Sequence, residues 1–366
     1  MKKMKFTPAA LAVLLWAALT VCAWVLPGKD VSVAERRPLA QAPEFSVKNL
    51  MSGKFMADFE DYSLDQFPLR DGFRTVKSIF HTYVLGQKDN NGIYISGGYA
   101  AQQEYPLKED SVDHALDRFN RVYETYLQPQ GSKVYMTVVP DKGYYLAESS
   151  GHLVMDYDRM FTLFREGMPW AEHIDLTGVL TLEDYYRTDT HWRQEALPEA
   201  AEILCDAMGV TPFEPEELTA VALERPFYGV YYGQAALPME PETMYILENS
   251  ILSQCTVLDH ETGRTGSIYD LAAMENRDQY DVFLSGAKSL LTITNPNATT
   301  DRELIVFRDS FGSSMVPLLL KDYKTVTLVD IRYVQQGMLG RFLDFSGQDV
   351  LFLYSTLVLN NSSTIK

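Results

Sequence analysis

Apolar positions divide the chain into one long uncharged run near the N-terminus and many shorter periodic segments. Residues 6–26 carry no charged side chain, and Lys2, Lys3 and Lys5 precede them. These 21 residues rise about 30 Å as a helix, which is close to the thickness of a bilayer's hydrocarbon core. The run predicts a membrane anchor or signal over residues 1–27, with the lysines inside and the following chain outside the membrane.

The end of the apolar run helps to distinguish a membrane anchor from a cleaved signal peptide. A secretory signal has an apolar core of about 7–15 residues and ends at a small-x-small site. The run here is longer and ends in "AWVLPG", which is a poor cleavage site. We therefore expect a single uncleaved anchor in the cell membrane and an extracytoplasmic domain, with secretion after cleavage as the alternative. Lipoprotein processing at Cys22 is disfavoured, because Val21 stands where a small residue belongs.

Residues 28–85 are predicted to form a linker and a helical lead-in. Pro38 and Pro43 break any helix in the first part. From residue 53 onward, apolar residues recur at helical spacing, at Phe67, Phe73, Val76, Ile79, Phe80, Tyr83 and Val84.

The remaining chain, residues 86–366, alternates between strand-like and helix-like segments. Predicted strands cover 91–99, 133–140, 173–176, 304–307, 325–333 and 349–355, and predicted helices cover 111–127, 156–167 and 195–209. This alternation indicates an α/β domain with a mostly parallel sheet covered by helices. Residues 213–300 contain short β-like runs with turn residues between them, and they predict a β-rich insertion.

Charge and cysteine content exclude several classes of protein. The formal net charge is −17, which argues against nucleic acid as a partner, because phosphate binding needs a basic surface. Cys22, Cys205 and Cys255 lack the spacing of metal ligands, so we expect no metal. No phosphate loop or G-x-G-x-x-G occurs, and we expect no cofactor. Two free buried thiols at 205 and 255 are favoured over a disulfide.

Two separate motifs carry candidate chemistry. In "YYRTDTHWRQ" (185–194), Asp189 lies two residues before His191. In "LIVFRDSFGSSM", Ser310 follows a buried strand and precedes a segment that can begin a helix. A serine hydroxyl needs a base to become a good nucleophile, a histidine supplies that base, and a carboxylate orients the histidine. A helix N-terminus beside the serine offers backbone N–H groups to an oxyanion.

Each motif also has a purely structural interpretation. Asp309 and Ser310 are residue types that cap helices, and Asp189 or Thr190 can cap the helix that follows. A lone histidine beside a tryptophan is more often structural than catalytic. Only the two motifs together favour a Ser-His-Asp triad.

The motifs resemble the DHHW family and the related alginate O-acetyltransferases of the AlgJ/AlgX kind, which are SGNH-hydrolase-like. "DTHW", "RDSF" and "DIRY" occur in the family's order, and "VVPDKGYY" and "YDVFLSGAKSLLTITN" also match. The similarity covers nearly the whole chain after the anchor. It implies an SGNH-like three-layer α/β/α fold over residues 86–366, with the β-rich insertion at about 213–300.

The resemblance implies Ser310 as nucleophile, His191 as base and Asp189 as the group that orients the base. It also places Arg332, Tyr333 and Asp309 in or near the pocket, although an ion pair and a core aromatic explain Arg332 and Tyr333 equally well. The chain departs from the family pattern at three positions: Thr190 replaces the first histidine of the DHHW name, Arg308 replaces the glycine common before the aspartate, and no asparagine follows Gly286. Lys142 is interpreted as structural.

The resemblance further implies acyl transfer, commonly of acetyl groups, to an exported or cell-wall polysaccharide. A multi-span membrane protein is then expected as acyl donor. Two alternatives stay open: a carbohydrate esterase with the same triad, in which water is the acceptor, and a non-catalytic glycan-binding or scaffold protein.

Overall fold

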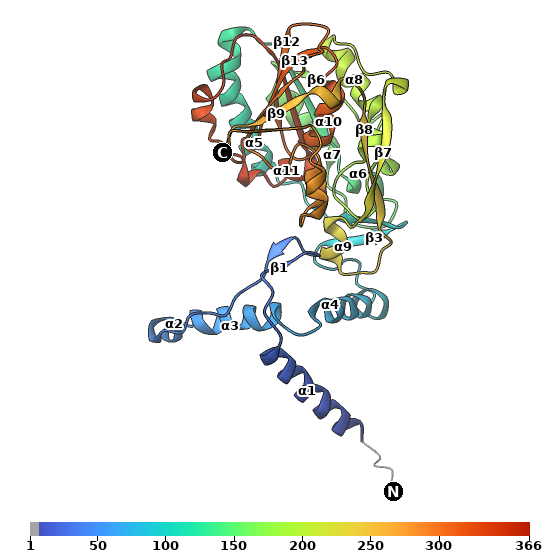
Figure 1. Ribbon diagram of the computed structural model, residues 1–366, viewed down its shortest axis with the longest axis vertical. Coiled ribbons are helices and arrows are strands. Elements are labelled where there is room, and N and C mark those ends of the chain that lie inside the picture. Colours follow the sequence, from blue (N-terminus) through green and yellow to red (C-terminus); the bar gives the residue numbers. More distant parts are fainter. Residues whose placement is uncertain (1–6) are drawn as a thin grey trace. The chain divides into compact units, whose positions relative to one another are not determined.

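The computed structural model describes residues 7–366 (Figure 1). Contacts between Cα atoms divide the chain into two compact units. The first unit is Met1–Asn91 together with Tyr232–Pro238, and the second is Gly92–Tyr231 together with Met239–Lys366. The candidate chemistry lies in the second unit.

The first unit begins with helix α1 (Pro8–Val25), whose N-terminus is capped by the Thr7 side chain. Pro8 takes the first helical position, where its missing N–H costs no hydrogen bond. Among the residues that the structure describes, no helix combines the length and the apolar character needed to cross a bilayer. The anchor predicted for residues 1–27 includes residues 1–6, which lie outside the described residues, and it stays a prediction.

The segment predicted as a linker contains a short antiparallel pair, β1 (Val31–Ser32) and β2 (Arg37–Pro38). Pro38 is tolerated there because a strand at an edge need not donate from its nitrogen. The helical spacing predicted from residue 53 onward appears as three consecutive helical segments, preceded by one short helix. Their bounds are α2 (Val47–Met51), α3 (Lys54–Asp65), α4 (Arg70–Ile79) and the π-helical turn η1 (Phe80–Val84).

An eight-stranded sheet organises the second unit, in the order β10-β9-β11-β13-β12-β14-β5-β6. The strands are β5 (Val134–Val139), β6 (Glu172–His173), β9 (Thr256–Asp259), β10 (Arg264–Gly266), β11 (Leu290–Thr294), β12 (Arg302–Arg308), β13 (Tyr323–Val329) and β14 (Asp349–Ser355). Pairs from β13 through β12, β14 and β5 to β6 are parallel, and β10, β9 and β11 continue the sheet antiparallel. The predicted α/β fold with a mostly parallel sheet is confirmed.

Helices cover both faces of this sheet. Residues of α5 (Glu109–Val122) and α7 (Tyr157–Gly167) pack in one apolar cluster, and residues of α8 (Pro198–Met208) and α10 (Gly312–Met315) pack in the other. The remaining helices are α6 (Lys142–Leu146), α9 (Val230–Ala235) and α11 (Thr356–Leu359). The helix predicted over 195–209 begins later, because residues 194–196 form a 3-10 turn: α8 starts at Pro198 and ends before Gly209, which has a φ of 65°.

Strand β14 contributes side chains to both apolar clusters, one on each face of the sheet. All seven of its residues are buried, as expected for a central strand with both faces covered. Leu351 and Leu353 point into the cluster on the α8 side, whereas Phe352 and Tyr354 point into the cluster on the α5 side. The period of two along the strand therefore divides its side chains between the two layers.

The predicted β-rich insertion over 213–300 is only partly separate. Strands β7 (Thr219–Phe227) and β8 (Glu242–Glu248) form a two-stranded ribbon of their own, but β9, β10 and β11 belong to the main sheet. The strand predicted for 91–99 is a hairpin of β3 (Ile93–Ser96) and β4 (Tyr99–Gln102), which turns at Gly97 and Gly98. Short apolar runs reveal strands, but not the partners with which distant strands pair.

Both core thiols are free, as predicted: Cys205 and Cys255 are buried and unbridged. Burial raises the pKa of Cys205 to about 12 and that of Cys255 to about 11. These thiols therefore stay protonated at neutral pH and act as small apolar side chains.

We predict that Phe352→Ala lowers the free energy of unfolding by about 3–5 kcal/mol, the usual cost of removing a buried phenylalanine. The Phe352 ring lies 4.7 Å from the Phe307 ring and 5.1 Å from the Phe119 ring, measured between centroids, so its loss leaves a cavity at the centre of this core. Denaturant unfolding measures the change. Phe352→Leu should cost less than half as much, and equal losses for the two variants would contradict the proposed packing.

Candidate active site

Residues 185–192 form a tight hairpin-like loop that presents Asp189 at its tip. Tyr185 and Trp192 pair as an antiparallel bridge, and the Tyr186 N–H donates to the His191 carbonyl at 3.1 Å. The Asp189 carboxylate accepts the His191 backbone N–H at 3.1 Å. The aspartate thus closes its own turn, and the same turn sets the direction of the histidine.

A second segment clamps this loop from outside. The Gly229 N–H donates to Thr188 Oγ1 at 3.0 Å, and the Val230 N–H donates to Asp189 Oδ2 at 2.8 Å. A β-carbon at position 229 would lie 2.2 Å from the Thr188 carbonyl oxygen, so only glycine permits this approach of two backbones. The clamp leaves Asp189 Oδ1 to the histidine.

The separate β-ribbon also holds the loop. The carboxylate of Glu242, on β8, accepts from the N–H groups of Arg187 and Thr188, each at 2.8 Å, and from Thr188 Oγ1 at 2.7 Å. Three donors on one carboxylate make a strong anchor, because hydrogen bonds to an ionised acceptor are shorter and stronger. The ribbon therefore helps to position Asp189.

The Ser310 turn is fixed to the sheet by its neighbouring aspartate. Asp309 Oδ1 accepts from the Phe311 N–H at 3.0 Å, and Oδ2 accepts from the Ser355 N–H at 2.8 Å and from Ser355 Oγ at 2.7 Å. Asp309 is fully buried. Its carboxylate therefore ties the end of β12 to the end of β14, and its predicted place in the pocket stays a prediction.

Folding brings the three residues of the predicted triad together. His191 Nε2 lies 2.7 Å from Ser310 Oγ, and His191 Nδ1 lies 2.6 Å from Asp189 Oδ1. Asp189 is fully buried and His191 is 6% exposed, whereas Ser310 is only partly buried. A buried carboxylate, an imidazole and a more accessible hydroxyl form one hydrogen-bonded chain, which is the geometry that activates a serine.

An aromatic ring that sequence reasoning missed fixes the plane of the imidazole. Tyr280 stacks on His191 with ring centroids 3.8 Å apart and an angle of 5° between the planes. Its hydroxyl lies 2.7 Å from Ser314 Oγ, which also accepts from Trp192 Nε1 at 2.8 Å. Ser314 thus ties the histidine loop, the stacking tyrosine and the nucleophile turn together. The segment "YDVFLSG", which begins at residue 280, is part of the stretch that resembles the DHHW family. Its sequence does not indicate that Tyr280 stacks on the histidine.

Arg332 and Tyr333, predicted to line the pocket, contact each other and Asp330. The Arg332 guanidinium donates to both Asp330 carboxylate oxygens, at 2.9 and 2.6 Å, and lies 5.6 Å from the Tyr333 ring centroid. Tyr333 is 52% exposed, so it is not a core aromatic. A role of either side chain toward substrate stays a prediction.

Arg308, the departure from the family pattern, is fully buried behind the nucleophile turn. Its guanidinium donates to Ser313 Oγ at 3.0 Å and to the Gly286 carbonyl at 3.4 Å. Burial lowers its pKa from the ordinary arginine value. The side chain links the turn at 310 to the segment at 286.

Lys142 stabilises the loop at residues 185–192 that carries His191, in agreement with its structural interpretation. Its buried ammonium group donates to the carbonyls of Tyr186 at 2.8 Å and Arg187 at 3.2 Å. Burial lowers the pKa of Lys142 to about 7, although Asp189 and Glu242 act in the opposite direction.

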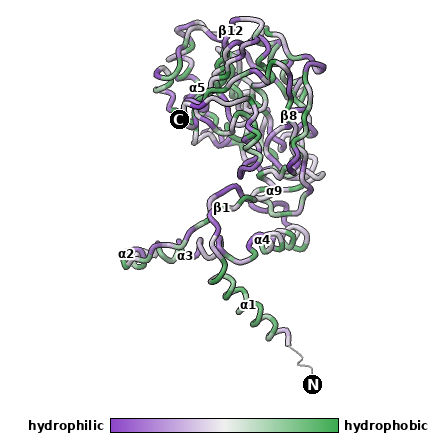
Figure 2. Tube along the Cα trace, in the orientation of Figure 1, coloured by the Kyte–Doolittle hydropathy of each residue, from purple (hydrophilic) through white to green (hydrophobic). Residues whose placement is uncertain are grey.

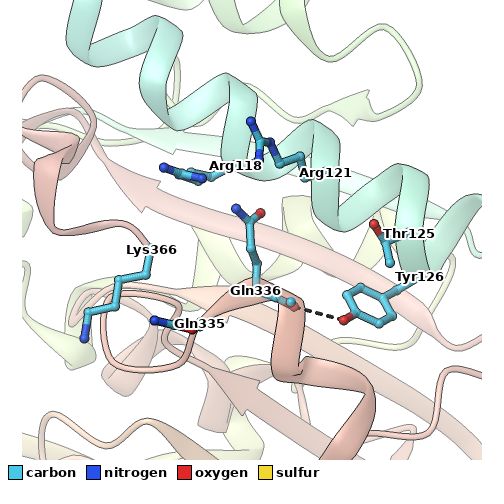
Figure 3. A pocket seen from close by; sticks show the side chains of 8 residues that line it. Arg118, Arg121, Thr125, Tyr126, Gln335, Gln336 and Lys366 are labelled. Atoms are coloured by element: carbon cyan, nitrogen blue, oxygen red, sulfur yellow. Dashed lines mark hydrogen bonds between the residues drawn. The ribbon is translucent and has the colours of Figure 1, made fainter.

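A cavity of about 480 Å³ lies elsewhere in this unit. Figure 3 shows its lining, which includes Arg118, Arg121, Tyr126, Gln336 and Lys366 and none of the triad residues. Asp117 pairs with both arginines. Across residues 7–366, no group of three or more His, Cys, Asp and Glu side chains is arranged to hold a metal ion.

The fold and site define the class of protein: an α/β protein with a mostly parallel sheet and a serine at the carboxyl end of a central parallel strand. The model of the DHHW family, described as DHHW protein, matches residues 181–329, which include all three positions of the predicted triad. The resemblance to the DHHW family is therefore confirmed over this segment. No curated protein matches the sequence.

Two solved structures share the fold with a TM-score above 0.5. A DHHW family protein from Eubacterium siraeum is 21% identical, with a TM-score of 0.60 over 76% of this chain and 95% of that chain. Bacillus cereus PatB1 with a sulfonyl adduct is 16% identical, with a TM-score of 0.57 over 73% of this chain and 94% of that chain. The O-acetyltransferase domain of Pseudomonas putida AlgJ is 14% identical, with a TM-score of 0.45 over 74% and 92%.

We predict that Tyr280→Leu lowers the rate at which a fluorophosphonate labels Ser310 by about tenfold, while Tyr280→Phe keeps it within about threefold. Leucine removes the flat surface that holds the imidazole plane, whereas phenylalanine keeps the ring and loses only the hydrogen bond to Ser314. The labelling rate constant is measured for both variants. Equal losses would assign the effect to the hydroxyl and contradict a role for stacking.

We predict that the free energy of unfolding rises with pH between 7 and 8.5, in part because of Lys142. Its pKa is about 7 in the folded chain and about 10.4 in an unfolded chain. The unfolded state therefore binds more protons in this interval, and stability increases as pH rises. Denaturant unfolding at several pH values measures the slope, which Lys142→Met should reduce. The interval stops below the range in which the buried thiols act in the opposite sense.

Proposed function

We propose that this protein is an extracytoplasmic SGNH-like serine O-acyltransferase that acetylates a cell-surface or exported polysaccharide through an acyl-serine intermediate. The observation that carries the proposal is the hydrogen-bonded chain from Asp189 through His191 to Ser310, with contacts of 2.6 and 2.7 Å. The DHHW match over residues 181–329 and the fold shared with PatB1 support it. The N-terminal segment serves as the membrane anchor in this proposal.

The first half-reaction transfers the acyl group to the enzyme. Ser310 Oγ attacks the carbonyl carbon of the donor ester while His191 Nε2 takes the hydroxyl proton. The new bond joins Oγ to the acyl carbon. The bond to the donor's leaving oxygen then breaks, and this oxygen takes the proton back from His191. Asp189 holds Nδ1–H and stabilises the imidazolium that exists between these steps.

The second half-reaction returns the acyl group to a sugar. A glycan hydroxyl attacks the acyl-serine carbonyl, and His191 Nε2 accepts its proton. The carbon–Oγ bond breaks, Ser310 regains a proton from His191, and the sugar leaves as an ester. Atoms and charges balance without a metal or a redox partner.

A donor for the oxyanion stands beside the nucleophile. Within the described part of the chain, the Ser310 backbone N–H has no hydrogen-bond partner, whereas the Phe311 N–H is used by Asp309. A free N–H next to the attacking oxygen is placed to stabilise the negative charge of a tetrahedral intermediate.

An esterase with the same triad is the second candidate. It differs only in the acceptor, because water replaces the sugar hydroxyl when the site does not exclude it. The partly buried position of Ser310 is compatible with both. A non-catalytic glycan-binding or scaffold role is the third candidate, and it predicts no activated serine.

The decisive test asks whether Ser310 is activated. A fluorophosphonate or sulfonyl fluoride should label the wild-type chain, and Ser310→Ala should abolish labelling. His191→Ala should slow it at least about 100-fold, the usual contribution of a general base. His260→Ala, which changes a histidine that contacts Thr292, is the matched control and should label normally. Absence of labelling in the correctly folded wild type would favour the scaffold.

Acceptor choice is tested separately. Enzyme that reacts with the serine probe is incubated with p-nitrophenyl acetate as donor and an oligosaccharide as acceptor. Mass spectrometry then measures acetylation of the oligosaccharide. A gain of acetyl on the sugar that depends on Ser310 supports the transferase. Release of free acetate at the same rate with and without sugar supports the esterase.

A further inference from the structure

Strand β12, labelled in Figure 2, has an arginine at each end and the apolar residues 304–307 between them. Arg302, at the first end, pairs with the Asp349 carboxylate, and its side chain is 33% exposed. Arg308, at the end that leads into the Ser310 turn, is fully buried. The two ends place different demands on an arginine, because burying a charged group is costly unless an opposite charge compensates it.

The Arg308 guanidinium binds only uncharged acceptors in the described part of the chain. It donates to the Asp309 carbonyl at 3.3 Å, to Ser313 Oγ at 3.0 Å and to the Gly286 carbonyl at 3.4 Å. Its Nε atom is buried and has no hydrogen-bond partner among residues 7–366. The positive charge is therefore held by neutral dipoles and not by a carboxylate.

The two carboxylates that act on this guanidinium are engaged elsewhere. Burial lowers the pKa of Arg308, and the charges of Asp330 and Asp309 act in the opposite direction. Asp330 accepts two hydrogen bonds from Arg332, and the Asp309 carboxylate accepts from the backbone and side chain of Ser355. Because arginine keeps its proton in proteins, a charged group without a direct ion pair lies beside the nucleophile turn.

One acceptor of Arg308 belongs to the peptide group that carries the candidate oxyanion donor. The Asp309 carbonyl and the Ser310 N–H are the two ends of one peptide unit. This carbonyl accepts from Arg308 Nη1 at 3.3 Å and from the Gly312 N–H at 3.2 Å. Donors on the carbonyl side of a peptide polarise its N–H, and a charged donor has the larger effect. The guanidinium therefore makes the Ser310 N–H a stronger donor.

The stem of Arg308 lies directly against the turn that follows Ser310. A β-carbon at position 312 would lie 2.8 Å from Arg308 Cβ and 3.2 Å from Cγ. Gly312 therefore allows the first turn of α10 to approach the arginine stem, and Ser313 from the same turn accepts from the guanidinium. These contacts hold the charge in a fixed position relative to the Ser310 peptide.

We propose that Arg308 is a positioning residue for acyl transfer, which polarises the Asp309–Ser310 peptide so that the Ser310 N–H stabilises the negative charge of the tetrahedral intermediate. The inference rests on the proposed function, because it concerns the same serine. No asparagine follows Gly286 to supply a side-chain donor, so a strengthened backbone donor has a clear use here. The effect is largest when the oxygen carries full charge, so it lowers the barrier more than it strengthens binding.

Labelling kinetics of the full-length chain with a fluorophosphonate test the proposal. Ser310 Oγ attacks phosphorus, His191 takes the hydroxyl proton, fluoride leaves, and the phosphoryl oxygen gains negative charge in the transition state. Arg308→Met removes the charge and should lower the maximal labelling rate by about tenfold or more. Loss of a whole oxyanion donor costs about 100- to 1,000-fold, which sets the upper limit. The probe concentration that gives half the maximal rate should change by less than about twofold.

Arg308→Lys separates the charge from the packing of the side chain. The lysine ammonium keeps a positive charge and can donate to the Asp309 carbonyl, although it lacks the guanidinium fork. This variant should label at least about threefold faster than Arg308→Met. Equal maximal rates for the two variants would assign Arg308 a purely structural role and overturn the proposal.

Arg302→Met is the matched control, because it removes an arginine from the opposite end of the same strand. It should lower the free energy of unfolding and keep the maximal labelling rate of the folded protein within about twofold. A loss of rate equal to that of Arg308→Met would reflect general destabilisation and contradict the inference. Wild-type labelling with an unchanged Arg308→Met rate would overturn the role of Arg308 and leave the proposed function standing. A folded wild type that does not label would overturn both.

Discussion

One hydrogen bond, between His191 Nε2 and Ser310 Oγ at 2.7 Å, joins two segments that are 119 residues apart, and much of the second unit holds its two ends in place. The serine end is fixed because Asp309 ties β12 to β14 through Ser355. The histidine end is fixed because the loop that carries it is clamped by Gly229 and by Glu242 on the β-ribbon. A short contact of this kind needs rigid supports on both sides.

The supports are electrostatic as well as steric. A buried carboxylate is costly unless donors surround it, and Asp189 meets this condition through the Val230 N–H, the His191 N–H and the imidazole. Lys142 contributes hydrogen bonds to the same loop, and burial lowers its pKa to about 7. At neutral pH the amine is therefore charged in only part of the molecules, which lowers the cost of burying it.

The two units differ in which side chains they bury. The second unit covers a sheet on both faces and buries nearly all of its large apolar residues, as a water-soluble domain does. The first unit pairs its charges internally, as Arg70 and Arg74 do with Glu35, and leaves apolar side chains outward.

The sequence alone determined the type of most elements, because period, capping residues and punctuation by glycine and proline are local: the helix predicted at 195–209 appears as α8 (Pro198–Met208), and Gly209 ends it. It also pointed to Asp189, His191 and Ser310, which the fold brings into one hydrogen-bonded chain, since their types and motifs are chemically distinctive. Tertiary structure alone decided that β9, β10 and β11 extend the main sheet and that Tyr280 stacks on His191. Those facts depend on pairing between residues far apart in the chain, and no local pattern encodes which distant surface a strand, ring or helix face will meet.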